Sequence, residues 1–337
     1  MTLGAAVGEA VLGRRIGNRA ILWGAVAGTL PDLDVFVPLG DVVSDFTYHR
    51  SASHSLFVLA LLTPLMAWLI SRIHRDLRDQ RIRVAIMLYL CFVTHVLLDC
   101  FTAYGTQIFW PISEMPVAWA TVFIIDPAYT LPLLIGVICA LVMTRENDRG
   151  HLVNRAGLTL STAYLAWTIV GSSIATSRFE AELEARQVPY DDMFVTPGPF
   201  NTLIWRAVVI DGDGYQEGWY SLFDGDAPVV FTHYPSQREL LTDIADHWPV
   251  QRLTWFSHGF YSVIEDAGDI IISDLRMGIE PNYVFRFKVG EIGNPHARPV
   301  TPAQLAPVRD LGRLSQLWDR IWNASLPMSP PAPVGAQ

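Results

Sequence analysis

Cysteine and lysine are both scarce in this sequence of 337 residues, and negative charges outnumber positive ones. The three cysteines lie in or beside apolar runs, so no disulfide framework is predicted. The basic residues are nearly all arginine, and the net charge is -9 at pH 7. This acidic balance gives no electrostatic support to a general nucleic-acid-binding role, and nucleic acid is not expected as a partner.

Several familiar sequence motifs are also missing. There is no Gly-x-Ser-x-Gly elbow and no P-loop, so a serine hydrolase and an ATPase both lack support. The apolar N-terminal stretch contains Glu9 and is followed by Arg14 and Arg15 in place of a small-residue cleavage site. It is therefore not expected to be a cleavable signal peptide.

Long apolar runs dominate the first half of the chain. Hydrophobic residues make up 51% of the sequence and are concentrated before about residue 177. Since a spanning helix needs roughly 20 apolar residues, membrane helices are predicted at 54–72, 82–103, 119–144 and 156–176. Two shorter apolar pieces, 3–13 and 20–31, favour a helical hairpin or a partly re-entrant pair. The expected fold is an α-helical transmembrane bundle of four to six membrane segments, followed by a soluble α+β domain.

The distribution of arginine predicts the orientation in the membrane. Arginine-rich loops stay in the cytoplasm. The loop after the 54–72 run and the loop 145–155 are rich in arginine, whereas 104–118 has no Arg or Lys. We therefore expect a multi-pass protein of the bacterial inner (cytoplasmic) membrane with an extracytoplasmic, periplasmic C-terminal domain.

The composition changes after residue 177. A charged helix is predicted at 177–190, strands at 202–210, 215–223, 252–264, 269–275 and 282–289, and helices at 236–246 and 302–323. The predicted domains are a membrane domain, 1–176, an α+β domain, 177–325, and a disordered tail, 326–337, that is rich in Pro and Ala. The α+β domain is expected to cover the site, select a substrate or bind a partner.

Acidic and histidine side chains gather at one end of the predicted spans. Ionisable groups beside hydrocarbon are costly unless something compensates for their burial, and a metal ion is one such compensation. His95 and Asp99 are four residues apart and share a helix face, while Ser53 is a candidate N-cap before the 54–72 helix. The predicted topology places seven such groups at the outer face: Asp32, Asp34, His49, His54, His95, Asp99 and Asp126.

Each of these residues also has a purely structural explanation. Asp32 and Asp34 can end a helix, Asp126 before Pro127 can begin one, and a single interfacial histidine is more often structural than a ligand. It is the joint pattern that favours a site. Imidazole and carboxylate together suit zinc, and also manganese or iron. Seven groups exceed what one tetrahedral ion needs, so two or three divalent ions are reasonable.

The sequence also suggests roles for individual residues. A carboxylate of Asp34, Asp126 or Glu9 is a candidate general base. The guanidinium of Arg50 can pair with a phosphate. His74 and His151 fall in the arginine-rich loops and are left out of the site.

The order PDLD, HRSASHS, HVLLD, YGTQIFWP and IDP resembles the YdjM-like family of bacterial inner-membrane metal-dependent hydrolases, over roughly residues 3–145. Many relatives carry a histidine near the N-terminus where this chain offers Glu9. The resemblance implies a set of six metal-binding residues: Asp32, Asp34, His49, His54, His95 and Asp99.

Metal-assisted hydrolysis of a lipid phosphoester at the outer face is the function predicted from these features, with the bilayer and a lipid as partners. Ester and amide cleavage, the substrate, the metal and the oligomeric state stay open. The alternative is a metal-binding membrane protein without turnover, such as a sensor, a transport component or an assembly factor. Ionisable residues grouped at one face favour a site over a conduction pathway.

Overall fold

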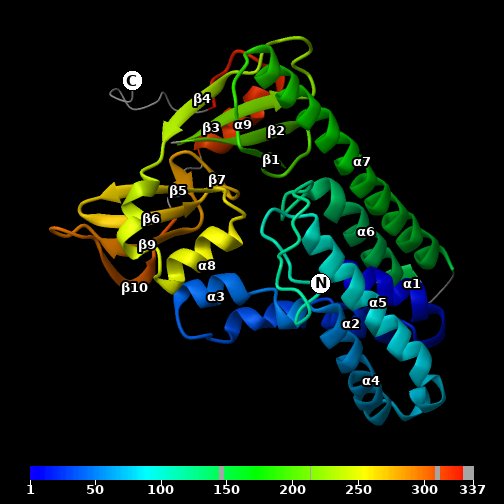
Figure 1. Ribbon diagram of the computed structural model, residues 1–337. Coiled ribbons are helices and arrows are strands. Elements are labelled where there is room, and N and C mark those ends of the chain that lie inside the picture. Colours follow the sequence, from blue (N-terminus) through cyan, green and yellow to red (C-terminus); the bar gives the residue numbers. More distant parts are fainter. Residues whose placement is uncertain (144–147, 213, 308–311, 329–337) are drawn as a thin grey trace. The chain divides into compact units, whose positions relative to one another are not determined.

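The computed structural model describes residues 1–143, 148–212, 214–307 and 312–328 (Figure 1). The chain divides into two units, which are described separately. The first comprises Met1–Pro38, Tyr48–Trp119 and Ile124–Trp167, and the second comprises Leu39–Thr47, Ala120–Phe123 and Thr168–Gln337. Most of the predicted disordered tail, 326–337, lies outside the described residues.

The first unit is helical. Its elements are α1 (Thr2–Ile16), α2 (Asn18–Ala27), the short 3-10 helices η1 (Pro31–Phe36), η2 (Ala52–His54) and η3 (Arg75–Gln80), then α4 (Leu56–Ile73), α5 (Arg81–Cys100), α6 (Pro127–Met143) and the first part of α7 (Arg149–Ala185). Three helical stretches of the described chain are long and apolar enough to cross a membrane: Leu56–Ile73, Arg75–Cys100 and Arg149–Ala185. The predicted helical N-terminal region is therefore confirmed, while a total of four to six spans stays a prediction.

The predicted span at 119–144 is wrong at its N-terminal end. The helix begins at Pro127 and has 17 residues. Asp126 Oδ1 accepts hydrogen bonds from the backbone N–H groups of Ala128 and Tyr129, at 2.8 and 3.4 Å. A carboxylate that accepts from these N–H groups caps a helix, and proline is favoured directly after a cap. Asp126 therefore caps the start of α6, which is the structural explanation that the sequence analysis gave for it.

Glycine allows the backbones of α1 and α2 to pack directly against each other. The two helices form a hairpin, as the sequence predicted. A Cβ atom on Gly24 would lie 2.2 Å from the carbonyl oxygen of Gly4, and one on Gly8 would lie 2.3 Å from that of Ala20. Small residues permit such close approach of helices within membranes. The thiol of Cys91 on α5 donates to the carbonyl oxygen of Gly4, at 3.4 Å. The hairpin is thereby packed directly against α5.

We expect Gly24→Ala to lower the melting temperature of the protein in detergent, because the added methyl group forces α1 and α2 apart. Overpacking of this kind typically costs about 1–3 kcal/mol. Leu22→Ala, at an exposed position of the same helix, is the control and should melt close to the wild type. Equal melting temperatures for Gly24→Ala and the wild type would contradict the close packing.

The second unit contains two four-stranded antiparallel sheets (Figure 1). The first has the order β1 (Asp192–Pro197), β2 (Ile204–Asp211), β3 (Gly214–Ser221) and β4 (Phe231–Pro235). The second has the order β10 (Arg298–Gln304), β9 (Arg286–Glu291), β6 (Asp269–Asp274) and β5 (Tyr261–Asp266). A small pair, β7 (Gly278–Ile279) with β8 (Asn282–Tyr283), and the helices η4 (Arg238–Ile244), α8 (Trp248–Phe256) and α9 (Gly312–Trp322) complete it. The predicted mixture of helices and sheets after the helical region is confirmed.

Several predicted boundaries in this unit are wrong. The strand expected at 252–264 starts only at Tyr261, because α8 occupies Trp248–Phe256 and has Pro249 in its first turn, where proline favours a helix. The helix expected at 302–323 is described only over Gly312–Trp322, and Arg298–Gln304 pairs with β9 as a strand. The charged helix expected at 177–190 ends at Ala185 as the continuation of α7. Pairing with β9 overrode the local helical pattern at Arg298–Gln304.

One segment of the second unit comes from far earlier in the chain. Residues 39–47 include most of the short helix α3 (Val42–Tyr48), and they belong to the second unit although both flanking segments belong to the first. Val43 and Thr47 are fully buried, and Phe46 is almost fully buried. This excursion separates Asp34 from His49 in the sequence.

Candidate metal centre

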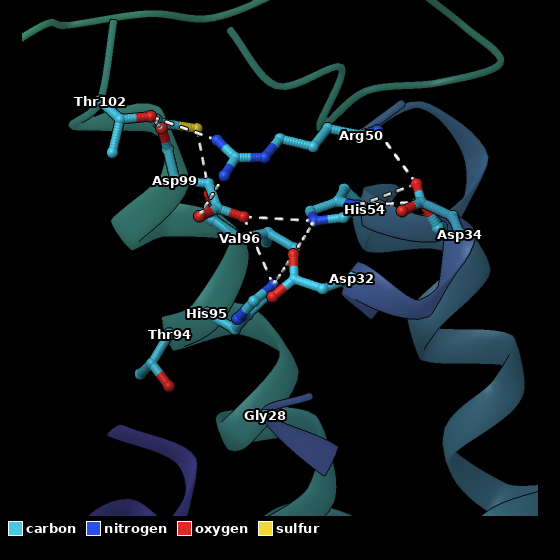
Figure 2. Close-up of polar contacts among 12 residues, drawn as sticks. Gly28, Asp32, Asp34, Arg50, His54, Thr94, His95, Val96, Asp99 and Thr102 are labelled. Atoms are coloured by element: carbon cyan, nitrogen blue, oxygen red, sulfur yellow. Dashed lines mark hydrogen bonds and ion pairs between the residues drawn. The ribbon is translucent and has the colours of Figure 1, made fainter. Parts of the chain in front are cut away.

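Four of the predicted ligands converge at one point of the first unit (Figure 2). Asp32, His54, His95 and Asp99 each offer one ligand atom, and these atoms all lie within 4.8 Å of one another. Asp99 Oδ2 lies 3.2 Å from His54 Nε2 and 3.3 Å from His95 Nε2. Asp32 Oδ1 lies 3.4 Å from His54 Nε2 and 3.5 Å from His95 Nε2.

Three separate chain segments deliver these side chains. His95 and Asp99 lie one turn apart near the end of α5, so both point to the same side. Asp32 lies on η1, which follows directly after α2, and His54 ends η2, immediately before α4. Glycines hold α1 against α2, and this hairpin contacts α5 through Cys91. Because η1 follows α2, Asp32 comes to lie beside His95 near the end of α5. The site therefore forms where two long apolar helices and the hairpin end together.

The donor set fits a metal ion. Among the described residues, none makes a hydrogen bond with His54 Nε2, His95 Nε2 or Asp99 Oδ2, although all three atoms are buried. Buried polar atoms are rarely left unpaired, so their common direction indicates a missing partner. Donors at about 2.0–2.1 Å from a tetrahedral ion are separated by about 3.3 Å, close to the four distances above. The side chain of Asp32 is 45% exposed, which leaves the group open on one side.

A network of hydrogen bonds orients His54. Ser53 donates its hydroxyl proton to Asp34 Oδ2, and Ser53 Oγ also lies 2.9 Å from His54 Nδ1. Because the single hydroxyl proton is used on Asp34, His54 Nδ1 must be the donor in the second bond. A neutral imidazole with its proton on Nδ1 has a lone pair on Nε2, the atom that faces the other ligands. Ser53 is thus an outer partner of the site, and the cap of α4 is Ser55, contrary to the prediction.

Asp34 and His49 form a second pair beside this group but outside it. His49 Nδ1 and Asp34 Oδ1 are 2.8 Å apart, and the backbone N–H of Arg50 donates to Asp34 Oδ2 at 3.1 Å. Burial alone would raise the pKa of Asp34, but the hydrogen bonds from His49, Ser53 and Arg50 lower it to about 2. The carboxylate is therefore ionised, and the structure uses it to hold the segment 49–53.

Asp32 is held as a carboxylate in the same way. Burial would raise the pKa of Asp32, but the adjacent imidazoles of His54 and His95 keep that pKa well below its ordinary value. An ionised carboxylate is the form that binds a cation.

Arg50 supplies the positive charge nearest to the group. Its guanidinium lies 3.4 Å from Asp99 Oδ1 and donates to Thr102 Oγ1 at 3.2 Å. The guanidinium also lies 5.2 Å from the ring centroid of Tyr104. Arg50 has a φ of 63°, a left-handed conformation that a residue with a side chain adopts only when its surroundings enforce it.

Two predicted catalytic residues, Glu9 and Asp126, are not brought into the group. Both carboxylate oxygens of Glu9 are hydrogen-bonded, one to His151 Nδ1 and the other to Asn154 Nδ2. Asp126 caps α6 and accepts a hydrogen bond from the Tyr164 hydroxyl at 2.7 Å. His151, which the sequence placed in a cytoplasmic loop, is buried on α7 as the partner of Glu9. The structure assigns Glu9 and Asp126 to helix packing and helix capping.

The sequence reasoning missed Ser53, Thr102 and Tyr104 as neighbours of the site. Ser53 lies between two named histidines, and its hydroxyl is a natural partner for either. Thr102 donates to the carbonyl oxygen of Asp99 at 2.7 Å and accepts from Arg50. The ring of Tyr104 lies 5.5 Å from that of His49. Thr102 and Tyr104 follow Asp99 within five residues. Their closeness in the sequence to a predicted ligand could have identified them as neighbours of the site.

The fold and the site define a helical membrane protein with a candidate metal centre. The model of the YdjM inner membrane protein family matches residues 1–175, more than half of the chain, and the chain belongs to this family. The resemblance seen in the sequence is thereby confirmed, and the match covers every residue of the metal group. No curated protein and no solved structure matches the chain.

We expect Glu9→Gln to reduce the melting temperature without changing bound metal, because it weakens a buried network that lies apart from the metal group. Leaving a buried polar group without its hydrogen-bond partner costs about 1–3 kcal/mol, and the isosteric amide should cost part of that. Metal content by elemental mass spectrometry and thermal unfolding in detergent measure the two effects. Asp126→Asn is the parallel variant. Loss of metal in either protein at a temperature where it is folded would contradict this assignment.

Proposed function

We propose that this protein is a membrane-embedded metal-dependent hydrolase that acts on a lipid phosphoester at the outer face of the inner membrane. The observation that carries the proposal is the convergence of four ligand atoms on a point where three buried ones lack hydrogen-bond partners. A site that keeps one side open can admit a substrate, whereas purely structural metal sites are closed. The side chain of Asp32 is 45% exposed, so water or a substrate would approach from this side, where it would add to the four protein ligands or displace Asp32.

Zinc is the ion we propose, held by Asp32, His54, His95 and Asp99. The described residues contain one group of this kind, so a single ion is expected there. When bound, such an ion acidifies a water molecule and polarises the phosphoryl or acyl oxygen of a substrate. Manganese and iron are the alternatives, because they accept the same ligand types.

The surrounding residues suit acid–base and anion-binding roles. We assign the Asp34–His49 pair as the general base, since a carboxylate hydrogen-bonded to Nδ1 fixes the orientation of an imidazole that can take up a proton. Arg50 is assigned to the substrate, because its charge lies beside Asp99 and its Nε has no hydrogen-bond partner among the described residues. A guanidinium in this position can bind a phosphate oxygen.

The distribution of charge along the helices supports a site at the outer face. The ligands lie at the beginning of α4 and at the end of α5. The opposite ends of these helices carry the arginine cluster, Arg72, Arg75, Arg78, Arg81 and Arg83. Arginine-rich ends are retained in the cytoplasm, so the metal group would lie at the other surface. There a lipid head group can enter while its acyl chains stay in the bilayer.

Metal analysis tests the centre directly. We expect the purified wild type to contain about one zinc ion per chain and His54→Ala and Asp99→Ala to lose it, because each removes one of four ligands. His296→Ala removes an exposed histidine and serves as the control. Elemental mass spectrometry on protein never exposed to chelator gives the result. Wild-type protein without stoichiometric metal would contradict the proposed centre.

An activity measurement separates a hydrolase from a metal-binding protein without turnover. Arg50→Lys should reduce hydrolysis of a fluorescent phospholipid in nanodiscs by about 100-fold, because a misplaced charge stabilises the transition state poorly. Its metal content should remain that of the wild type, and Arg72→Ala, at the opposite end of α4, is the control. A sensor or assembly factor would instead show no metal-dependent hydrolysis in any of the three proteins.

A further inference from the structure

The segments that build the metal group also carry exposed apolar side chains. On η1 the two acids point inward, Asp32 to His95 and Asp34 to His49 (Figure 2). The exposed apolar residues between and after these acids are Leu33, Val35, Phe36 and Val37. Phe36 is 79% exposed, so the described residues of the chain leave its ring almost uncovered. The same short helix therefore presents acids to the site and hydrocarbon to its surroundings.

A second apolar projection is formed by residues 107–116, in the segment that follows α5. Its base is closed by the backbone bridge between Thr106 and Val117. The backbone N–H of Leu56 donates to the carbonyl oxygen of Ile108 at 3.0 Å, which fixes the projection beside the start of α4. Its exposed apolar residues are Phe109, Ile112 and Met115.

We call the exposed apolar side chains of residues 33–37 and 109–115 the apolar rim. Single exposed apolar residues are normal on a protein surface, whereas groups of them mark a site of interaction. The rim has almost no charge. Residues 104–118 contain one charged residue, Glu114, and the charge within 33–37 is that of Asp34, whose carboxylate is hydrogen-bonded inside the site. The surface is therefore suited to an apolar partner.

The neighbouring helix indicates which partner this is. The rim lies beside the start of α4, which is long and apolar enough to cross a membrane and exposes Phe57 and Leu61 along its length. Trp110 and the half-exposed Trp119 lie in the segment of the second projection. Tryptophan is enriched where a membrane meets water. Because lipid chains are as apolar as leucine, they can cover such a surface without cost.

We propose that the apolar rim lies among the acyl chains at the boundary of the bilayer, so that the metal group opens sideways to lipid instead of to bulk water. This inference deepens the proposed function and rests on it for the role of the site. A phosphoester lipid would then reach the ion by lateral diffusion, with its chains against the rim. The substrate class is thereby narrowed to long-chain lipids that remain in the membrane.

The depth of the rim can be measured without metal or substrate. Nitroxide labels at Phe36→Cys and Ile112→Cys, in nanodiscs of phosphatidylethanolamine and phosphatidylglycerol, report their accessibility to oxygen and to a water-soluble nickel complex. We expect both labels to lie about 5–10 Å below the lipid phosphates, the depth of apolar faces at a membrane interface. Leu61→Cys, an exposed position within α4, is the lipid reference. Asp148→Cys, at a side chain that is 76% exposed, is the aqueous reference.

The labels are placed in a Cys139→Ser background, because Cys91 and Cys100 are buried and Cys139 is partly exposed. Nickel accessibility at Phe36 and Ile112 equal to that at Asp148 would overturn the inference. Labels that are closed to both oxygen and nickel would also overturn it, because they would indicate a protein partner on the rim.

Chain-length selectivity is the second test. The ratio of kcat/KM for a dioleoyl phospholipid in nanodiscs to that for its dihexanoyl counterpart in solution should fall about tenfold in the double variant Phe36→Asp/Ile112→Asp, since lifting the site by about two CH2 groups of an acyl chain costs that much. Val142→Asp, at an exposed position near the end of α6, is the control and should keep the wild-type ratio. An unchanged ratio in the double variant would contradict the role of the rim. A wild type that hydrolyses neither lipid would overturn the proposed function, while the label depths would still decide whether the rim lies in the bilayer.

Discussion

The cost of burying charge at the ends of apolar helices is the constraint on which the candidate centre depends. His54, His95 and Asp99 are nearly inaccessible to solvent, so their polar atoms need partners within the protein or from a bound ion. His95 and Asp99 share α5, but His54 precedes α4, so only tertiary packing brings all three together. The backbone packing of α1 against α2, which holds η1 beside α5, is therefore a condition for the site as well as for the fold.

The helical unit contains two buried groups of charged residues, and they differ in how their polar atoms are used. In the group around Glu9, both carboxylate oxygens are hydrogen-bonded to side chains of α7. In the group around Asp99, the Nε2 atoms of His54 and His95 lie 3.2 and 3.3 Å from Asp99 Oδ2, and none of these three buried atoms has a hydrogen-bond partner among the described residues. A carboxylate with both oxygens hydrogen-bonded has a structural role, whereas buried nitrogen and oxygen atoms that converge without hydrogen bonds indicate a site for a cation. Burial alone would not have separated Glu9 from the ligands.

The sequence predicted those parts of the centre that depend on local spacing. The four-residue separation of His95 and Asp99, and the position of His54 directly before an apolar helix, are properties of single segments. The role of Glu9 could not be predicted, because its partner His151 lies 142 residues away and only tertiary packing brings them together. The strands at 192–197, 231–235 and 298–304 were missed for a similar reason, since each depends on pairing with a neighbouring strand more than on its own alternation.

Residues 39–47 show that the family match does not contain all the partners of the segments it covers. That match ends at residue 175, so it includes Phe46 but none of the three aromatic rings around it. Phe256, Phe285 and Phe287 belong to the part of the chain beyond the match. A buried phenylalanine loses its stabilisation when its surrounding rings are absent. In this chain, residues 39–47 therefore depend on α8 and β9 for their packing, although they lie within the matched part of the sequence.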